Sequence, residues 1–366
     1  METESDVKYF SICKPINVKM KGKKRKILIG FLLVILILIL IYRDLISYGI
    51  MQAKGQYHIL ANAKPIEEYL NDPGFPDSLK VKIRFVQEVR RFAIDSLGLE
   101  NSDNYTTLFD QKGKNILWNV SASEKYEMKP KEWGFPFLGT FSYKGFFDLR
   151  RAKEERDELV KQGLDTQIRT VGGWSTLGWF QDPILSNMLS RKDGQLAELI
   201  IHELTHATLF VKDSIEFNEN LATFIGEKGA LRFLYQKYGK NSIQVDEYLR
   251  SFDDSKNFAD HMLAGYKSLD ELYRSETFLY EPDTAVKNQI KEDLIWQIVE
   301  SLDSIEFSQE LKFKKIFSER LPNNAYFMAF QRYRAKQNIF DQEFRELHQG
   351  NIRSFIRYFA DKYPSL

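Results

Sequence analysis

The most apolar stretch of the chain is the run ILIGFLLVILILILIY at residues 27–42, which contains no charged side chain. A helix that spans a bilayer needs about 20 apolar residues, so this run is slightly short. Lys26 and Arg43 flank the run and can reach the interface with their charged ends. The pattern therefore predicts a transmembrane anchor at residues 27–43. A cleaved signal peptide is the alternative, but Arg43 and Asp44 stand where small residues would mark a cleavage site.

Basic residues crowd the N-terminal side of this run and predict its orientation. They are Lys19, Lys21, Lys23, Lys24, Arg25 and Lys26. Since cytoplasmic flanks carry the excess of lysine and arginine, residues 1–26 are expected in the cytoplasm. Residues 44–366 are then expected outside it. The prediction is a single-pass protein of the inner cell membrane with a periplasmic domain.

Beyond the anchor, helical and strand-like patterns separate along the chain. Apolar spacing predicts helices at residues 45–62, 75–97 and 150–162. Alternating or aromatic, glycine-punctuated runs predict strands within residues 115–147, 166–171 and 175–180. From residue 194 the pattern is helical almost to the end, with breaks near Pro282 and Pro322. The fold class is therefore expected to be α+β, with a small mixed sheet in residues 44–193 followed by a mainly helical half in residues 194–366.

Composition and charge narrow the class of protein. With 43% hydrophobic and 28% charged residues, the chain of 366 residues fits a folded globular protein rather than a disordered one. Its formal net charge of +1 creates no field that favours nucleic acid, so no nucleic-acid partner is expected. Cys13 is the single cysteine, which excludes a disulfide within the chain and a cysteine-ligated zinc site.

The run His202-Glu203-Leu204-Thr205-His206 is the clearest candidate for chemistry. Residues four apart share one face of a helix, so His202 and His206 can offer two imidazoles to one metal ion. Glu203 stands beside them, placed to act on a water bound to that metal. The alternative is a pair of core or surface histidines on an ordinary helix. An HExxH run is rare by chance in a chain with 5 histidines.

A catalytic zinc takes a third protein ligand and keeps one position open for water. Glu216, Glu219 and Glu227 are the candidates. The short connection after the first helix predicts an antiparallel hairpin, with the first turn of the second helix near the histidines, which favours Glu219. Glu227 lies about 12 Å further along the helix, so these two glutamates cannot bind the same ion. Asn218 is expected to cap the second helix.

Two histidines and a carboxylate, without a nearby thiol, suit Zn²⁺ with an open coordination position. Such an ion lowers the pKa of its bound water toward about 7. Glu203 would take the proton from that water and pass it to the leaving amine. The sequence therefore predicts a zinc-dependent metallopeptidase with a peptide as substrate.

These residues resemble the gluzincin metallopeptidases, in which a glutamate on the next helix completes HExxH. Across most of residues 44–366 the chain is similar to the bacterial family of putative aminopeptidases. The matching runs are KGQYHIL at 54–60, RRFA at 90–93, LWNVSA at 117–122, WGFPFLGTFSYKGFF at 133–147, WSTLGWFQDPI at 174–184, IIHELTH at 200–206, FNENLATFIGEKGA at 217–230 and LPNNAYF at 321–327. The resemblance implies a zincin-like fold, an aminopeptidase activity, zinc on His202, His206 and Glu219, and Glu203 as base.

The resemblance also implies parts that handle the substrate. In gluzincins a strand in the position of WSTLGWF forms the sheet edge along which the substrate lies, while a buried aromatic strand is the alternative. Donors for the developing oxyanion are sought among Tyr326, Tyr333, His261 and His348. An acid that anchors the substrate amine is sought among Glu216, Glu227 and Asp182. A metal-binding but catalytically silent protein that binds peptides or a partner is the competing function.

Overall fold

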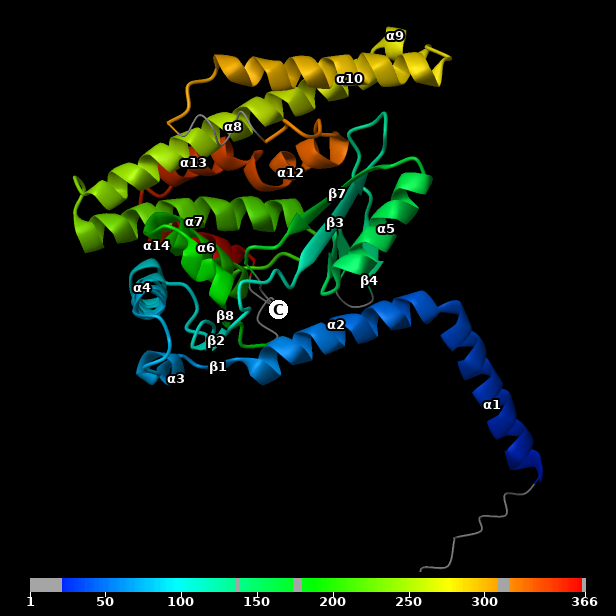
Figure 1. Ribbon diagram of the computed structural model, residues 1–366, viewed down its shortest axis with the longest axis horizontal. Helices are drawn as coiled ribbons and strands as arrows, with labels where there is room; N and C mark the ends of the chain where they lie inside the picture. Colours follow the sequence, from blue (N-terminus) through cyan, green and yellow to red (C-terminus); the bar gives the residue numbers. More distant parts are fainter. Residues whose placement is uncertain (1–21, 136–138, 174–179, 309–315, 364–366) are drawn as a thin grey trace, which may run out of the picture. The chain divides into compact units, whose positions relative to one another are not determined.

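A computed structural model describes residues 22–135, 139–173, 180–308 and 316–363 (Figure 1). The chain divides into two compact units, residues 1–53 and residues 54–366. The first unit contains α1 (Gly22–Ile41) and the start of α2 (Arg43–Asn62). No side chain of α1 is buried.

The apolar run is helical but bent where it ends. Among the described residues, no single helix combines the length and the apolar character needed to cross a membrane. Helices α1 and α2 reach that length and composition together, with a bend of 76° between them. The helix predicted at residues 45–62 is confirmed as part of α2, and it follows the apolar run at this bend rather than continuing straight.

Helices dominate the second unit, as the sequence predicts. The remaining α-helices are α3 (Ile66–Asn71), α4 (Asp77–Phe92), α5 (Leu149–Lys161), α6 (Asp193–Thr208), α7 (Ile215–Tyr238), α8 (Ile243–Arg274), α9 (Glu276–Leu279), α10 (Thr284–Glu300), α12 (Asn324–Arg334), α13 (Gln337–Glu346) and α14 (Ile352–Lys362). Shorter helical turns cover Ala93–Leu97, Ser186–Ser190 and Ser301–Ser304. The helices predicted at residues 75–97 and 150–162, and the breaks near Pro282 and Pro322, are confirmed.

The strands in the described residues form three small sheets. One has the order β1 (Lys64–Pro65), β2 (Thr107–Phe109), β8 (Ile184–Leu185), another β6 (Lys144–Phe146), β3 (Trp118–Ser123), β7 (Asp165–Thr170), and the third pairs β4 (Trp133–Phe135) with β5 (Gly139–Phe141). In the central sheet β3 pairs antiparallel with both neighbours, and Asn119 lies opposite Arg169. The α+β class is thus confirmed, although β1, β2 and β8 escape the sequence patterns because they are only two or three residues long.

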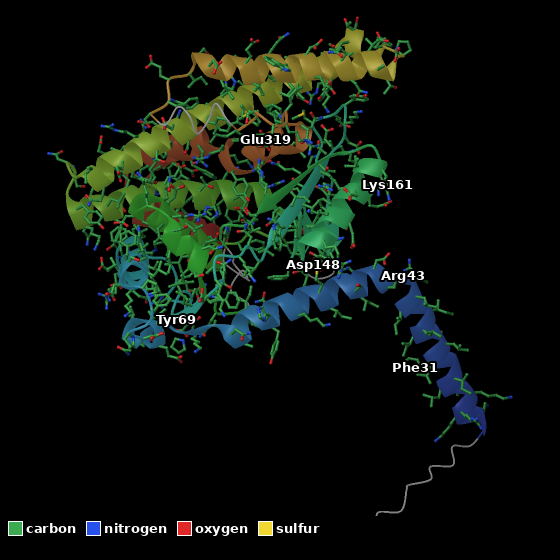
Figure 2. All side chains as sticks on the ribbon, viewed as in Figure 1. Phe31, Arg43, Tyr69, Asp148, Lys161 and Glu319 are labelled. Atoms are coloured by element: carbon green, nitrogen blue, oxygen red, sulfur yellow. The ribbon has the colours of Figure 1, made fainter. Side chains whose placement is uncertain are left out.

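The second unit is layered around α7 and α12 (Figure 1). Helix α8 packs on α7, α10 and α12, while α12 also packs on β3 and β7. Helix α5 covers that sheet, and Figure 2 marks its two ends with Asp148 and Lys161. The Asp148 side chain caps α5 by accepting a hydrogen bond of 2.8 Å from the backbone N–H of Arg150. Helix α7 thus packs against α6, α8, α12, α13 and α14.

An aromatic cluster anchors the C-terminal helices to α7. The ring of Phe224 on α7 packs against Phe340 on α13 and Phe355 on α14, with ring centroids 5.9 and 5.2 Å apart. Phe355 and Phe224 are almost fully buried. Since each buried aromatic side chain removes a large apolar area from water, this cluster holds α7 firmly in one orientation.

Helices α6 and α7 approach each other closely because glycines face the contact. A Cβ added to Gly226 would lie 3.0 Å from the carbonyl oxygen of Glu198 and 3.3 Å from Cβ of His202. A Cβ on Gly229 would lie 2.9 Å from a methyl group of Leu97 and 3.1 Å from Ile201. Glu219 near the start of α7 meets His206 near the end of α6, whereas Gly226 further along α7 meets Glu198 further back on α6, which confirms the predicted antiparallel hairpin.

We predict that Gly226→Val lowers the free energy of unfolding by about 1–3 kcal/mol, because the added methyl groups force α7 away from α6. Urea unfolding of the detergent-purified protein, followed by circular dichroism, measures the change. Gly134→Val on β4 is the matched control, since a Cβ there meets no described atom within 4 Å. An unchanged unfolding midpoint for Gly226→Val would contradict the close helix contact.

Candidate metal centre

Helix α6 carries the HExxH run and is fixed by both its apolar and its polar contacts. Leu196, Ile200 and Leu204 are buried along one stripe of the helix. At the first turn the Asp193 carboxylate accepts hydrogen bonds from Lys82 Nζ at 2.7 Å and from the Tyr238 hydroxyl at 2.6 Å. A carboxylate at a helix N-terminus also favours the helix dipole. These contacts set the rotation of α6 about its axis and hence the direction of its histidines.

The loop between α6 and α7 is braced by side chains rather than left free. Asn218 accepts a hydrogen bond from the N–H of Val211 at 2.9 Å and donates one to its carbonyl at 2.8 Å. The predicted cap by Asn218 is wrong, because α7 already begins at Ile215 and Asn218 lies within it. Asp213, with a positive φ of 57°, accepts a hydrogen bond from the N–H of Thr140 at 3.0 Å. The loop thereby also holds the β5 hairpin.

Three donor atoms from the two helices converge on one point. Nε2 of His202 lies 3.1 Å from Nε2 of His206. Oε2 of Glu219 lies 3.3 Å from the first nitrogen and 3.4 Å from the second. The three side chains are 16%, 7% and 12% exposed, so the convergence lies largely inside the protein.

The spacing of these atoms fits a small tetrahedral ion. Donors at about 2.1 Å from zinc, with tetrahedral angles, lie about 3.4 Å apart. The observed separations of 3.1 to 3.4 Å match that geometry. Among the described residues, this trio is also the cluster of histidine and acidic ligands that could hold a metal ion. The site therefore offers three protein ligands, the number that a catalytic zinc site takes.

The electrostatics of the trio keep the carboxylate charged. Burial alone would raise the pKa of Glu219, but the charge of His206 and hydrogen bonds from both imidazoles lower that pKa well below its ordinary value. Burial lowers the pKa of His206, yet Glu219 and Glu203 raise it overall. A carboxylate that stays ionised is the form that binds a cation.

Glu203 lies beside the trio without joining it. Burial raises the pKa of Glu203, and the neighbouring histidines partly oppose that increase. A Cβ added to Gly173 would lie 2.1 Å from Oε1 of Glu203, so the chain there passes directly against the carboxylate. A residue larger than glycine would displace Glu203. A carboxylate with a raised pKa next to a metal cluster is suited to accept and release a proton.

The structure separates the three candidates for the third ligand. Glu219 joins the histidines, whereas Glu227 forms an ion pair with Arg334 and Glu216 lies 3.3 Å from Nζ of Lys336. Both latter carboxylates also appear among the candidates for an amine anchor, and both have cationic partners within the protein. Asp182, the remaining candidate, is buried, and its backbone carbonyl accepts a hydrogen bond of 2.7 Å from the backbone N–H of Tyr105.

Two tyrosines stand next to the carboxylates of the site. Burial raises the pKa of Tyr333, and the charges of Glu219 and Glu203 raise it further. Burial, Glu219 and Glu203 act in the same direction on the pKa of Tyr143. Both hydroxyls therefore remain protonated donors near the trio. Tyr333 is among the oxyanion candidates from the sequence, whereas Tyr143 was not singled out, although it lies in the aromatic run at residues 133–147.

Asn220, which directly follows Glu219 in the sequence, fixes the position of Tyr333 relative to Glu219. The fully buried Asn220 side chain donates to the carbonyl of Arg332 at 2.6 Å and accepts from the N–H of Lys336 at 2.9 Å. These bonds tie the end of α12 to the first turns of α7. The sequence offers no signal for this bridge, since Asn220 and Arg332 are more than 100 residues apart.

The other predicted donors lie in different surroundings. His261 contacts the carbonyl of Ile298 at 2.7 Å, and His348 contacts Ser354 Oγ at 3.1 Å. The ring of Tyr326 lies beneath the guanidinium of Arg169 at 4.9 Å. The predicted substrate strand at WSTLGWF falls on residues 174–180, of which 174–179 lie outside the described residues.

No curated protein and no solved structure matches the chain. The model of a family described as "Putative aminopeptidase" matches residues 47–362, which is most of the chain and contains every residue of the candidate metal centre. The function indicated by that family is a peptidase. The chain belongs to the putative aminopeptidase family.

Proposed function

We propose that this protein is a zinc metallopeptidase of the gluzincin type, with His202, His206 and Glu219 as zinc ligands and Glu203 as general base. The single observation that carries the proposal is the convergence of three donor atoms within 3.1 to 3.4 Å of one another, with the Glu203 carboxylate beside them. The zincin-like fold is part of the proposal and rests on the packing of α6 against α7.

The residues divide the work of peptide hydrolysis. Zinc bound to the trio supplies a Lewis acid and a water of lowered pKa. Glu203 takes a proton from the attacking water and passes it to the leaving nitrogen, a task for which its raised pKa is suited. Tyr333 and Tyr143 donate hydrogen bonds to the oxygen that gains charge on the scissile carbonyl. Gly173 leaves room for the Glu203 carboxylate to move between these positions.

The direction of cleavage follows the family. Membership of the putative aminopeptidase family supports removal of residues from a free N-terminus. The alternative function is a metal-binding protein that binds peptides without cleaving them. The nearness of Glu203 to the trio favours hydrolysis, because a purely binding site does not need a buried carboxylate that is not a ligand.

We also propose that the apolar run anchors the protein in the inner membrane. The large apolar side chains of residues 27–41 are not buried by any described part of the protein, and Lys26 and Arg43 stand at the ends of the run. The lysine-rich flank supports a cytoplasmic N-terminus and an extracytoplasmic peptidase unit.

Metal content and turnover are expected to separate in one variant. Glu203→Gln should keep about one zinc per chain, measured by mass spectrometry of the purified protein, and lose activity by about 10²- to 10⁴-fold, because the base is gone while the ligands remain. His206→Ala should lose both. Glu271→Gln, an exposed carboxamide variant on α8, is the matched control. Wild-type protein that carries no stoichiometric zinc would refute the proposal.

A blocked N-terminus is expected to stop cleavage. We predict that N-acetylation of a peptide lowers kcat/KM on the order of 100-fold, because the blocked amine loses the positive charge by which an aminopeptidase holds its substrate, and a lost contact of this kind costs about 2–5 kcal/mol. The free and acetylated forms of one peptide are compared by chromatography of the products. Equal rates on the two forms would establish an endopeptidase instead.

Membrane attachment is expected to depend on the apolar run. The double variant Leu33→Asp and Leu36→Asp should move the protein from the carbonate-washed membrane pellet to the soluble fraction, because each acidic residue at a helix centre costs about 2.5–3.5 kcal/mol in a bilayer. The alanine variants of the same two residues are the control and should stay with the membrane. Wild-type protein in the soluble fraction would disprove the anchor.

A further inference from the structure

Two arginines near the candidate metal centre have no acidic partner among the residues that the structure describes. Arg169 lies on β7, with its guanidinium 4.9 Å from the ring centroid of Tyr326 on α12. The residue is partly buried, and its guanidinium forms no ion pair or hydrogen bond with the described residues. An arginine whose face is covered by an aromatic ring keeps its N–H edge free for a ligand.

Arg332 on α12 is the second. Its guanidinium donates to Ser142 Oγ at 3.1 Å and to the Ser142 carbonyl at 3.3 Å. It also lies 5.4 Å from the ring of Tyr143 and 6.0 Å from the ring of Tyr333. No carboxylate within the described ranges pairs with it. Its neutral partners orient the guanidinium, which has five donors, without neutralising its charge.

Each arginine is linked to a residue of the candidate metal centre, Arg332 by a hydrogen bond to its backbone and Arg169 by its nearness in the sequence to Gly173. Asn220, which follows Glu219, holds the carbonyl of Arg332 at 2.6 Å. Arg169 precedes Gly173 by four residues, and Gly173 lies against the Glu203 carboxylate. A chain of four residues spans at most about 14 Å. The charges of Arg169 and Arg332, like those of Glu219 and Glu203, act on the pKa of Tyr333, so both arginines lie near the candidate metal centre.

The charges of Arg169 and Arg332 favour the binding of an anion between them. Burial lowers the pKa of Arg169; the tyrosines Tyr326 and Tyr333 oppose this effect, and the charge of Arg332 adds to it. Two guanidinium groups that repel each other in partly buried positions destabilise the protein unless an anion joins them. Glu219 does not serve as this anion, since the two imidazoles engage it.

We propose that Arg169 and Arg332 form a subsite that binds a carboxylate of the peptide substrate beside the metal centre. Arginine binds carboxylates in a bidentate manner with its N–H edge. This inference rests on the proposed peptidase function and makes its substrate class narrower. The carboxylate comes either from the C-terminus of a short peptide or from an acidic side chain close to the cleaved bond. A C-terminal source makes the enzyme a peptidase of di- and tripeptides.

Kinetics on matched peptides test the subsite. The first pair is a dipeptide as free acid and as C-terminal amide; the second pair is an amidated tripeptide with Glu or with Gln after the cleaved bond. Wild-type protein is expected to prefer the charged member of one pair by about 10- to 100-fold in kcat/KM. The pair that shows the preference identifies the source of the carboxylate. Equal rates in both pairs would overturn the subsite.

In the variants Arg169→Gln and Arg332→Gln, the ratio of kcat/KM on the charged peptide to that on the neutral peptide is expected to fall close to one. Only the cleavage of the charged peptide should become slower. Arg169→Lys should restore part of the preference. Arg250→Gln, an exposed arginine on α8 paired with Asp246, is the matched control and should leave the preference unchanged. Equal losses on the charged and neutral peptides would instead assign both arginines a structural role.

A binding measurement separates this inference from the proposed catalysis. Calorimetry with the Glu203→Gln protein compares the affinity for the same acid and amide without turnover. Tighter binding of the charged form, lost when Arg169→Gln is added, supports the subsite. If wild-type protein nevertheless cleaves no peptide, only the catalytic proposal fails. Equal affinities in a wild-type protein that does hydrolyse peptides overturn the subsite and leave the catalytic proposal intact.

Discussion

The contact between α6 and α7 is the constraint on which the candidate site depends. His202 and His206 come from one helix and Glu219 from the other, and their donor atoms meet only if the helix axes are close. Gly226 permits that distance, since its missing Cβ leaves room for the backbone of α6. A metal site built on two packed helices is held more precisely than one built on loops. The hydrophobic core behind both helices, from Ile200 to Phe224, supplies the stabilisation.

Buried asparagines then connect this pair of helices to the rest of the unit. Asn220 fastens α7 to the end of α12, and Asn324 fastens the start of α12 to the loop after β3 through hydrogen bonds of 2.9 and 3.1 Å to the carbonyls of Glu124 and Lys125. Each amide satisfies backbone groups that would otherwise be buried without partners. Helix α12 is thereby held at both ends, which places Tyr333 near the candidate metal centre and Tyr326 at the sheet.

The site combines groups whose charges would be unfavourable in isolation. The Glu219 carboxylate is stabilised by two imidazoles, while burial raises the pKa of Glu203 next to it. Two carboxylates thus acquire different properties because one has direct partners and the other is mainly buried. The guanidinium groups of Arg169 and Arg332, which have no carboxylate partner among the described residues, add positive charge near these carboxylates. Such preorganised charge in a poorly hydrated place is the usual basis of catalysis by electrostatic stabilisation.

The sequence alone determined what depends on local spacing. The four-residue interval puts His202 and His206 on one face, the short connection sets a hairpin, and apolar periodicity locates most helices, because these features follow from helix geometry. Residue spacing favoured Glu219 but left Glu227 open, and it gave no sign of Tyr143, Arg169 or Arg332 near the site. Only the tertiary structure pairs Glu227 with Arg334 and brings the end of α12 to the candidate metal centre. Contacts between residues more than 100 positions apart depend on how buried surfaces pack, and local patterns of polarity do not encode that packing.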